Sequence, residues 1–239
     1  AASAYKYFCV VINQIKEKMQ KEIANFINLP KVMVLGNTGS GKTSLVNALA
    51  DLDIKIIKGP GNRTSLDGNG IIHGNFASHT FQPVFLIDSQ KRFIFCDCPS
   101  FCDTSDIRKE IIISYITDYL FHENTSVILL VATEVEIERN IEKDLLNNIE
   151  RAVEMLGDAS QLKKKLAIII SQGDQSMTKE DYREILGHIT RIGEKNYLEY
   201  FGSMHIYTMP RPKKRDIGKQ YNFEDKNEII DFILSNINK

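Results

Sequence analysis

The sequence predicts an α/β fold in which a mostly parallel sheet with one antiparallel edge strand carries helices on both faces. Short apolar runs alternate with helical patterns from Pro30 to the end of the chain, which indicates a parallel sheet. A glycine-rich loop joins the first run to a helix, and two later runs are too close together for a helical crossover. Ligands of such sheets bind at the carboxyl ends of the strands.

Length and composition agree with a globular chain. The 239 residues are 43% hydrophobic and 26% charged, which excludes a disordered tail and a fibrous repeat. The formal net charge of −1 predicts no nucleic-acid partner. Four cysteines are too few and too clustered for a disulfide framework, and neither a signal-peptide pattern nor a long apolar run occurs. We therefore expect a cytoplasmic protein with no membrane span in this chain.

The first predicted element is an amphipathic helix. Apolar residues spaced by threes and fours predict it over residues 4–28, and Pro30 ends it. Its apolar stripe packs either on the rest of the chain or on a helix of another chain. We expect residues 1–30 to form an N-terminal helical segment and residues 31–239 to form one domain.

The elements of that domain follow in order. We expect a strand at 31–35, a helix from 42, a strand at 92–96, a helix at 107–121, a strand at 127–132, a helix at 141–156, a strand at 166–170, a helix at 179–192, a strand at 204–207 and a helix at 225–237. Residues 80–87 and 91–96 are both strand-like, and the three residues between them predict an antiparallel hairpin. Pro83 cannot donate to a ladder, which places the first of these strands at the edge.

Residues 36–43 read Gly-Asn-Thr-Gly-Ser-Gly-Lys-Thr and lie between a predicted strand and a predicted helix. This is a complete G-x-x-x-x-G-K-T phosphate loop, typical of P-loop NTPases. Its glycines let backbone N–H groups converge on a β-phosphate, and Lys42 adds a catalytic positive charge at the β- and γ-phosphates. The Thr43 hydroxyl can ligate Mg²⁺. The predicted nucleotide-binding residues of this segment are Gly36, Asn37, Thr38, Gly39, Ser40, Gly41, Lys42, Thr43 and Ser44.

An acidic residue ends the apolar run at 93–96. Asp97 is predicted to hold Mg²⁺, directly or through water, because its strand lies beside the phosphate loop in the expected sheet. Pro99 follows it by two residues, as in the D-x-P-G switch motif of GTPases, while Ser100 replaces the glycine of that motif.

The long glycine-bearing segment at 59–79 is interpreted as switch one. Thr80 precedes the edge strand by the distance expected of a switch-one threonine that closes over Mg²⁺, so we assign Thr80 a metal-ligating and catalytic role. Ser78 and Thr64 are rival candidates, and a solvated loop hydroxyl is the simpler alternative for all three.

Residues 171–174, Ser-Gln-Gly-Asp, follow a buried strand at the place where GTPases carry N-K-x-D or T-K-x-D. Asp174 is predicted to accept hydrogen bonds from N1–H and the exocyclic amine of guanine, a donor pair that adenine lacks. Gln172 replaces the usual lysine and is expected to contribute to nucleotide binding. A helix N-cap or turn role is the alternative for Asp174. The final loop, residues 208–210, has no recognisable base-contacting pattern.

The phosphate loop, Thr80, residues 97–100 and residues 171–174 together resemble the translation-factor-related class of P-loop GTPases. Within that class the chain is most similar to the immunity-associated AIG/GIMAP-type G domains, neighbours of septins and of the chloroplast-import GTPases. The resemblance covers residues 31–236 and implies a switch that binds GTP or GDP with Mg²⁺. The family's Gly-Arg pair after the fourth core strand is absent, and Arg139 is the nearest arginine.

Hydrolysis is expected to be slow, because Phe101 stands where Ras-like enzymes carry a water-orienting glutamine. His73, His79 and Asn75 are alternative water-orienting candidates. A homodimer docked across the nucleotide face is one way to supply a missing arginine, with Arg63 as the first candidate. Two alternatives stay open: a P-loop kinase or ATPase of another class, and an interaction module that keeps GTP bound without hydrolysing it.

Overall fold

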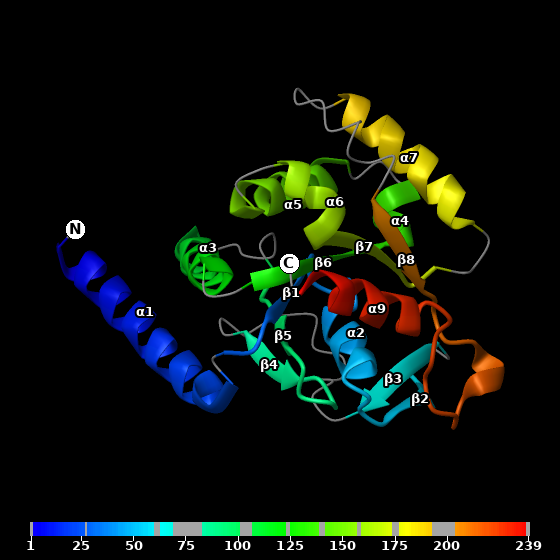
Figure 1. Cartoon of the computed structure of the whole chain (residues 1–239), viewed down its shortest axis with the longest axis horizontal. Coiled ribbons are helices and arrows are strands. Elements are labelled where there is room, and N and C mark those ends of the chain that lie inside the picture. Colours follow the sequence, from blue (N-terminus) through cyan, green and yellow to red (C-terminus); the bar gives the residue numbers. More distant parts are fainter. Residues whose placement is uncertain are drawn as a thin grey trace.

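A central sheet with helices on both faces forms the core of the computed structural model (Figure 1). The structure describes residues 2–26, 28–59, 63–68, 83–100, 107–122, 125–138, 142–156, 159–173, 177–192 and 204–237. The strand order is β4-β5-β1-β6-β7-β8. These strands are β1 (Lys31–Gly36), β4 (Val84–Ile87), β5 (Ile94–Asp97), β6 (Thr125–Thr133), β7 (Leu166–Ser171) and β8 (His205–Met209).

Neighbouring strands run parallel except at one edge, where β4 and β5 are antiparallel. The predicted mixed sheet is therefore confirmed. The predicted extent of its edge strand is wrong, because β4 begins at Val84 and Pro83 precedes it. A proline has no N–H to give to a ladder, so the strand begins after it.

Successive residues of β1 face opposite cores, because side chains alternate across a strand. Met33 and Leu35 belong to one buried cluster, and Val32 and Val34 belong to the other. The first cluster contains residues of α1 (Ala2–Ile23), α3 (Ile107–His122), α4 (Glu134–Glu138), α5 (Glu142–Leu156) and α7 (Lys179–Ile192). The second contains residues of α2 (Lys42–Leu49) and α9 (Lys226–Asn236). A short helix, α6 (Leu162–Lys165), precedes β7.

The N-terminal helix packs along α3, beside it in Figure 1. The helix ends at Ile23 and a 3-10 turn (Ala24–Phe26) follows it, so the helical segment ends before residue 28, the end that the sequence predicted. Ile15 and Met19 are buried in the same cluster as Ile116 of α3. Lys16 donates to the hydroxyl of Tyr115 at 2.6 Å, which adds a polar contact between the two helices. Within the described ranges, none of the helices is both long and apolar enough to cross a bilayer.

A second, two-stranded sheet, which the sequence did not predict, extends into the segment that was interpreted as switch one. β2 (Ile54–Lys58) and β3 (Thr64–Gly68) form an antiparallel hairpin, so the assignment of all of 59–79 to switch one is wrong. Ile56 donates its N–H to Lys219 and Tyr221 donates to Ile54. The hairpin thus pairs with the segment that follows β8, a partner far away in the sequence.

Candidate nucleotide site

The phosphate loop runs from the end of β1 into the first turn of α2, where Ser44 lies. Gly36 has a φ of 145°, and a Cβ added there would lie 2.2 Å from the carbonyl oxygen of Val131. Gly39 and Gly41 also have positive φ values, of 76° and 93°. Residues with a Cβ rarely adopt such angles, so these glycines are required for the shape of the loop.

Lys42 lies across this loop. Its ammonium donates to the carbonyl oxygens of Gly36 and Asn37, each at 2.9 Å, and the residue is only 9% exposed. The contacts keep a positive charge inside the loop, at the place where a phosphate group requires one.

Thr43 and Asp97 bring two oxygen atoms together beside the loop. The Thr43 hydroxyl donates to Oδ2 of Asp97 at 2.5 Å, and Asp97 is 8% exposed. Burial raises the pKa of Asp97, while the Thr43 hydrogen bond and the Lys42 charge act in the opposite direction. Hydroxyl and carboxylate oxygens are the ligands that Mg²⁺ prefers, so these two residues fit that ion.

Three buried hydroxyl groups at this edge of the sheet have no hydrogen-bond partner among the described residues. They belong to Thr38, Ser40 and Ser100. The first two are in the phosphate loop, and Ser100 follows β5 just after Asp97. Buried polar atoms normally have partners, so these hydroxyls fit a polar ligand such as a phosphate group.

The loop after β7 contacts the phosphate loop directly. Ser171 donates its hydroxyl to the carbonyl of Ser40 at 2.5 Å, and Gln172 donates its side-chain amide to the carbonyl of Gly39 at 2.6 Å. Gln172 has a φ of 60°, which turns the chain away from the strand. Gln172 is thus brought to the phosphate loop.

The final loop, which carried no recognisable pattern, lies against this segment. Arg211 donates its backbone N–H to the carbonyl of Gly173 at 3.0 Å, and its guanidinium lies 3.4 Å from Oε1 of Gln172. Tyr221 donates its hydroxyl to the carbonyl of Pro210 at 2.7 Å. Sequence reasoning missed these contacts because no short motif encodes them.

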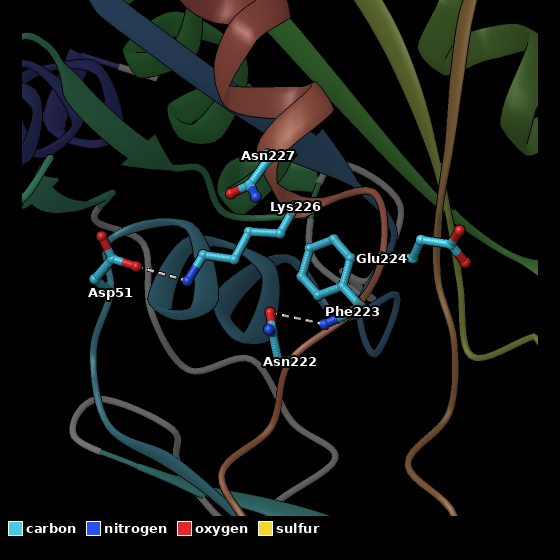
Figure 2. A pocket seen from close by; sticks show the side chains of 6 residues that line it. All are labelled: Asp51, Asn222, Phe223, Glu224, Lys226 and Asn227. Carbon is cyan, nitrogen blue, oxygen red and sulfur yellow. Dashed lines mark hydrogen bonds and ion pairs between the residues drawn. The ribbon is translucent and has the colours of Figure 1, made fainter.

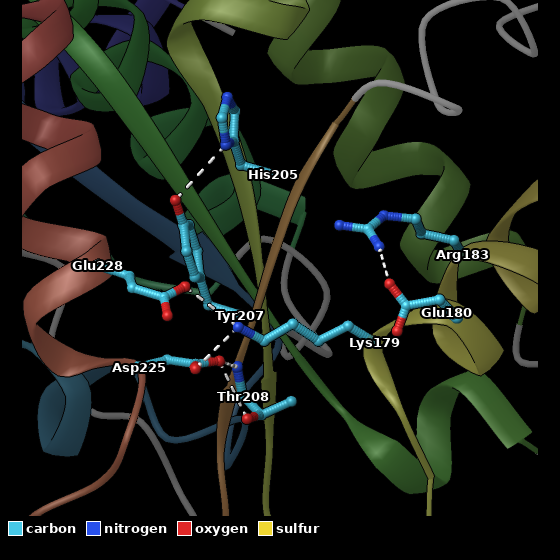
Figure 3. Close-up of polar contacts among 8 residues, drawn as sticks. All are labelled: Lys179, Glu180, Arg183, His205, Tyr207, Thr208, Asp225 and Glu228. Atoms are coloured by element: carbon cyan, nitrogen blue, oxygen red, sulfur yellow. Dashed lines mark hydrogen bonds and ion pairs between the residues drawn. The ribbon is translucent and has the colours of Figure 1, made fainter.

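A cluster of polar residues joins the start of α7, the end of β8 and the start of α9 (Figure 3). Asp225, at the start of α9, accepts the backbone N–H of Thr208 at 2.7 Å. Lys179 of α7 contacts Asp225 at 2.8 Å and Glu228 at 3.2 Å. These contacts join α7 and α9 across the end of β8 and hold the base of the loop.

The turn at the start of α4 was not predicted as part of the site. Glu136 accepts from the side-chain amide of Asn37 at 2.7 Å, and Asn148 donates to the other end of that amide at 3.3 Å. Glu134 is buried and accepts a hydrogen bond from the Tyr182 hydroxyl. The sequence signal was the pair of acidic residues that stands where the resembling family has Gly-Arg.

Several predicted residues lie outside the described part of the chain: Thr80, Ser78, His73, Asn75, His79, Phe101, Arg139 and Asp174. Thr64 lies in β3, where its hydroxyl donates to the carbonyl of Pro212 at 2.6 Å. Thr64 is therefore wrong as a candidate for the switch-one threonine. Arg63 precedes β3 and has an exposed side chain.

A surface pocket of about 420 Å³ opens at the start of α9 (Figure 2). Its lining residues are Asp51, Asn222, Phe223, Glu224, Lys226 and Asn227. Lys226 and Asp51 form an ion pair at 2.6 Å beside it. None of the predicted nucleotide-binding residues lines this pocket, so we do not assign it to the nucleotide.

The phosphate loop, the Thr43–Asp97 pair and the mixed sheet define a P-loop nucleotide-binding protein. The model of the 50S ribosome-binding GTPase family matches residues 31–172. The chain therefore belongs to this family of G domains.

Two of the similar solved structures, with TM-scores of 0.51 and 0.50, share the fold at low identity. A probable GTP-binding protein engB is 12% identical with a TM-score of 0.51, over 87% of this chain and 98% of that one. A dimerisation-deficient mutant of Toc33 from Arabidopsis thaliana is 13% identical with a TM-score of 0.50, over 93% and 90%. Era from Aquifex aeolicus bound to GDP·AlF4⁻ is 15% identical with a TM-score of 0.48. The match covers 87% of this chain and 56% of the Era chain. No curated protein sequence matches significantly.

Proposed function

We propose that the chain is a nucleotide-dependent switch that binds GTP and GDP with Mg²⁺ and hydrolyses GTP slowly. The observation that carries this proposal is the contact between Thr43 and Asp97 beside a glycine-shaped phosphate loop. Bound Mg²⁺ would neutralise charge on the β- and γ-phosphates. Lys42 would bind the same phosphates, and Thr43 and Asp97 would hold the ion.

The base-reading role is assigned to the loop after β7. Gln172 and the N–H groups near it lie between the phosphate loop and the final loop. We propose that Asp174, two residues further on, accepts from guanine, and that Thr80 completes the Mg²⁺ site. Both proposals are supported by the spacing of the motifs.

Slow hydrolysis is supported by the residues after Asp97. Ser100 replaces the glycine of the switch motif and is buried, and Phe101 carries no group that orients water. The same two residues favour a second candidate function, a module that keeps GTP bound without turnover.

We further propose the AIG/GIMAP type within the family, with activation by a second copy docked over the nucleotide face. Arg63 is the candidate arginine, because Thr64 next to it is hydrogen-bonded to the final loop. Residues 1–30 are proposed as a helical segment attached to a domain at 31–239, and the near-zero net charge and clustered cysteines support a cytoplasmic location.

The decisive experiment identifies the nucleotide and its turnover. The purified protein is denatured and the released nucleotide is separated by chromatography, and GTP turnover is timed with Mg²⁺ and with a chelator. Guanine nucleotide with Mg²⁺-dependent turnover supports the switch. Guanine nucleotide without turnover supports the non-hydrolysing module, and adenine nucleotide contradicts both.

A further inference from the structure

The start of α4 contacts the phosphate loop through Glu136. Its Oε1 accepts from the amide of Asn37 at 2.7 Å, and its Oε2 accepts from the N–H and hydroxyl of Thr133 at 2.5 and 2.9 Å. Glu136 in turn donates its N–H to the Thr133 hydroxyl at 3.1 Å. This reciprocal pair is a capping box, which fixes the carboxylate before it reaches Asn37.

The same turn contacts the base loop through Glu134. Tyr182, a buried residue of α7, donates its hydroxyl to Glu134. A Cβ added at Gly173 would lie 3.0 Å from Oε1 of Glu134 and 3.3 Å from the Tyr182 hydroxyl. The backbone of Gly173, which precedes the proposed base-reading residue, therefore packs against the side chains of Glu134 and Tyr182.

We propose that the turn at residues 133–136 is a positioning element for both halves of the nucleotide site. Glu136 positions the phosphate loop through Asn37, and Glu134 with Tyr182 positions Gly173, the residue that precedes Asp174 in the sequence. The inference rests on the proposed guanine-nucleotide function and names the residues that hold its two loops in place. Loops that are already fixed bind a nucleotide more tightly, because no conformational entropy is lost in ordering them when the nucleotide binds.

The charge of Glu136 would weaken phosphate binding if the residue had no positioning role. A carboxylate near the phosphate loop repels a polyphosphate, so its neutralisation would strengthen binding if the residue had no positioning role. A loss of binding on neutralisation is therefore the opposite of what charge repulsion alone predicts.

Glu136→Gln is the first test. Three donors converge on the two carboxylate oxygens, and an amide accepts at one end only, so at least one contact must break. We expect the affinity for GDP and for inorganic pyrophosphate, both measured by calorimetry with Mg²⁺, to fall by the same factor, about tenfold. The preference for GDP over ADP should not change. Glu154→Gln, an exposed residue of α5, is the control with the same change of charge.

Asn37→Ala tests the same contact from the other side. If the contact is the cause, the double variant should lose no more affinity than Asn37→Ala alone. Losses that multiply in the double variant would contradict the positioning role of Glu136.

Tyr182→Phe is the complementary test, because it removes only the hydroxyl that holds Glu134. We expect the preference for GDP over ADP to fall about tenfold while pyrophosphate affinity stays unchanged. A general loss of stability would lower both affinities together, so this crossed pattern separates positioning from a purely structural role.

The outcomes are distinct from those of the proposed function. If the wild-type protein binds pyrophosphate but does not prefer guanine, the proposed function is wrong, and so is the role proposed for Tyr182. The role proposed for Glu136 can still be tested in that case, by its effect on pyrophosphate affinity. If the wild-type protein prefers GDP, but both variants bind as it does or Glu136→Gln binds more tightly, the positioning role is wrong and the proposed function stands.

Discussion

At the scale of single residues, Lys42 is the side chain on which phosphate binding depends most directly. Its ammonium is held inside the loop by two carbonyl oxygens, so no other described group supplies the same charge there. Lys42→Ala is expected to reduce GDP affinity at least 100-fold, because charge-assisted contacts to phosphate are lost. Equilibrium dialysis measures this, with the exposed Lys58→Ala as control. Unchanged affinity would contradict the assignment of the phosphate loop.

Asp97 is expected to favour Mg²⁺ binding and to lower the stability of the ligand-free protein. Burial raises its pKa, so the charged carboxyl destabilises the ligand-free fold. Asp97→Asn should keep the Thr43 contact, abolish the Mg²⁺ dependence of GDP binding, and raise the Tm of the ligand-free protein. The exposed Asp53→Asn is the control.

The stability gain at Asp97 also has a predicted pH dependence. The gain is present above the raised folded-state pKa, where the wild-type carboxyl is charged. It vanishes below about pH 4, where the carboxyl is protonated in both the folded and the unfolded chain. Thermal melts across this range measure it, and a gain that is the same at every pH would show that charge burial is not its cause.

Asp174 tests the proposed base reading. Asp174→Asn offers an N–H donor where the carboxylate accepted two hydrogen bonds, so guanine should lose affinity and xanthine, with its 2-oxo group, should gain it. Competition between GDP and xanthosine diphosphate gives the ratio directly. An unaltered preference for guanine would move base reading to another residue.

At the scale of elements, α1 is held by its apolar stripe. Met19 is 2% exposed against α3, and large-to-small changes at such sites cost about 2–5 kcal/mol. Met19→Ala should therefore lower the free energy of unfolding by that amount in chemical denaturation. Val10→Ala on the same helix, where Val10 is 47% exposed, should change it by less than about 0.5 kcal/mol. Equal effects would mean that α1 does not pack on α3 in solution.

At the scale of the whole molecule, turnover should depend on assembly. An arginine supplied across an interface increases the rate by about 10³–10⁵. Specific GTPase activity should therefore rise with protein concentration, together with mass by light scattering, at saturating GTP and Mg²⁺. Arg63→Ala should remove the rise without changing GTP affinity. Flat specific activity would leave a separate activator or the non-hydrolysing module.

The sequence alone determined those features that depend on neighbours along the chain. The phosphate loop, the alternation of strands and helices, the antiparallel edge and the N-terminal helix all follow from local period and spacing. The extents of the edge strand and of switch one were wrong, because β4 starts after Pro83 and β3 lies within residues 59–79. Neither β2 nor β3 was predicted, since both lie in segments without a strong local pattern.

Tertiary structure decided the contacts between residues far apart in the chain. β2 is held by residues near Lys219, Asn37 meets Glu136, and Gly173 lies against Glu134. No local period records such pairs, since each partner follows the pattern of its own element. They form only when the sheet brings the carboxyl ends of β1, β6 and β7 to one edge, which is why the loops there meet.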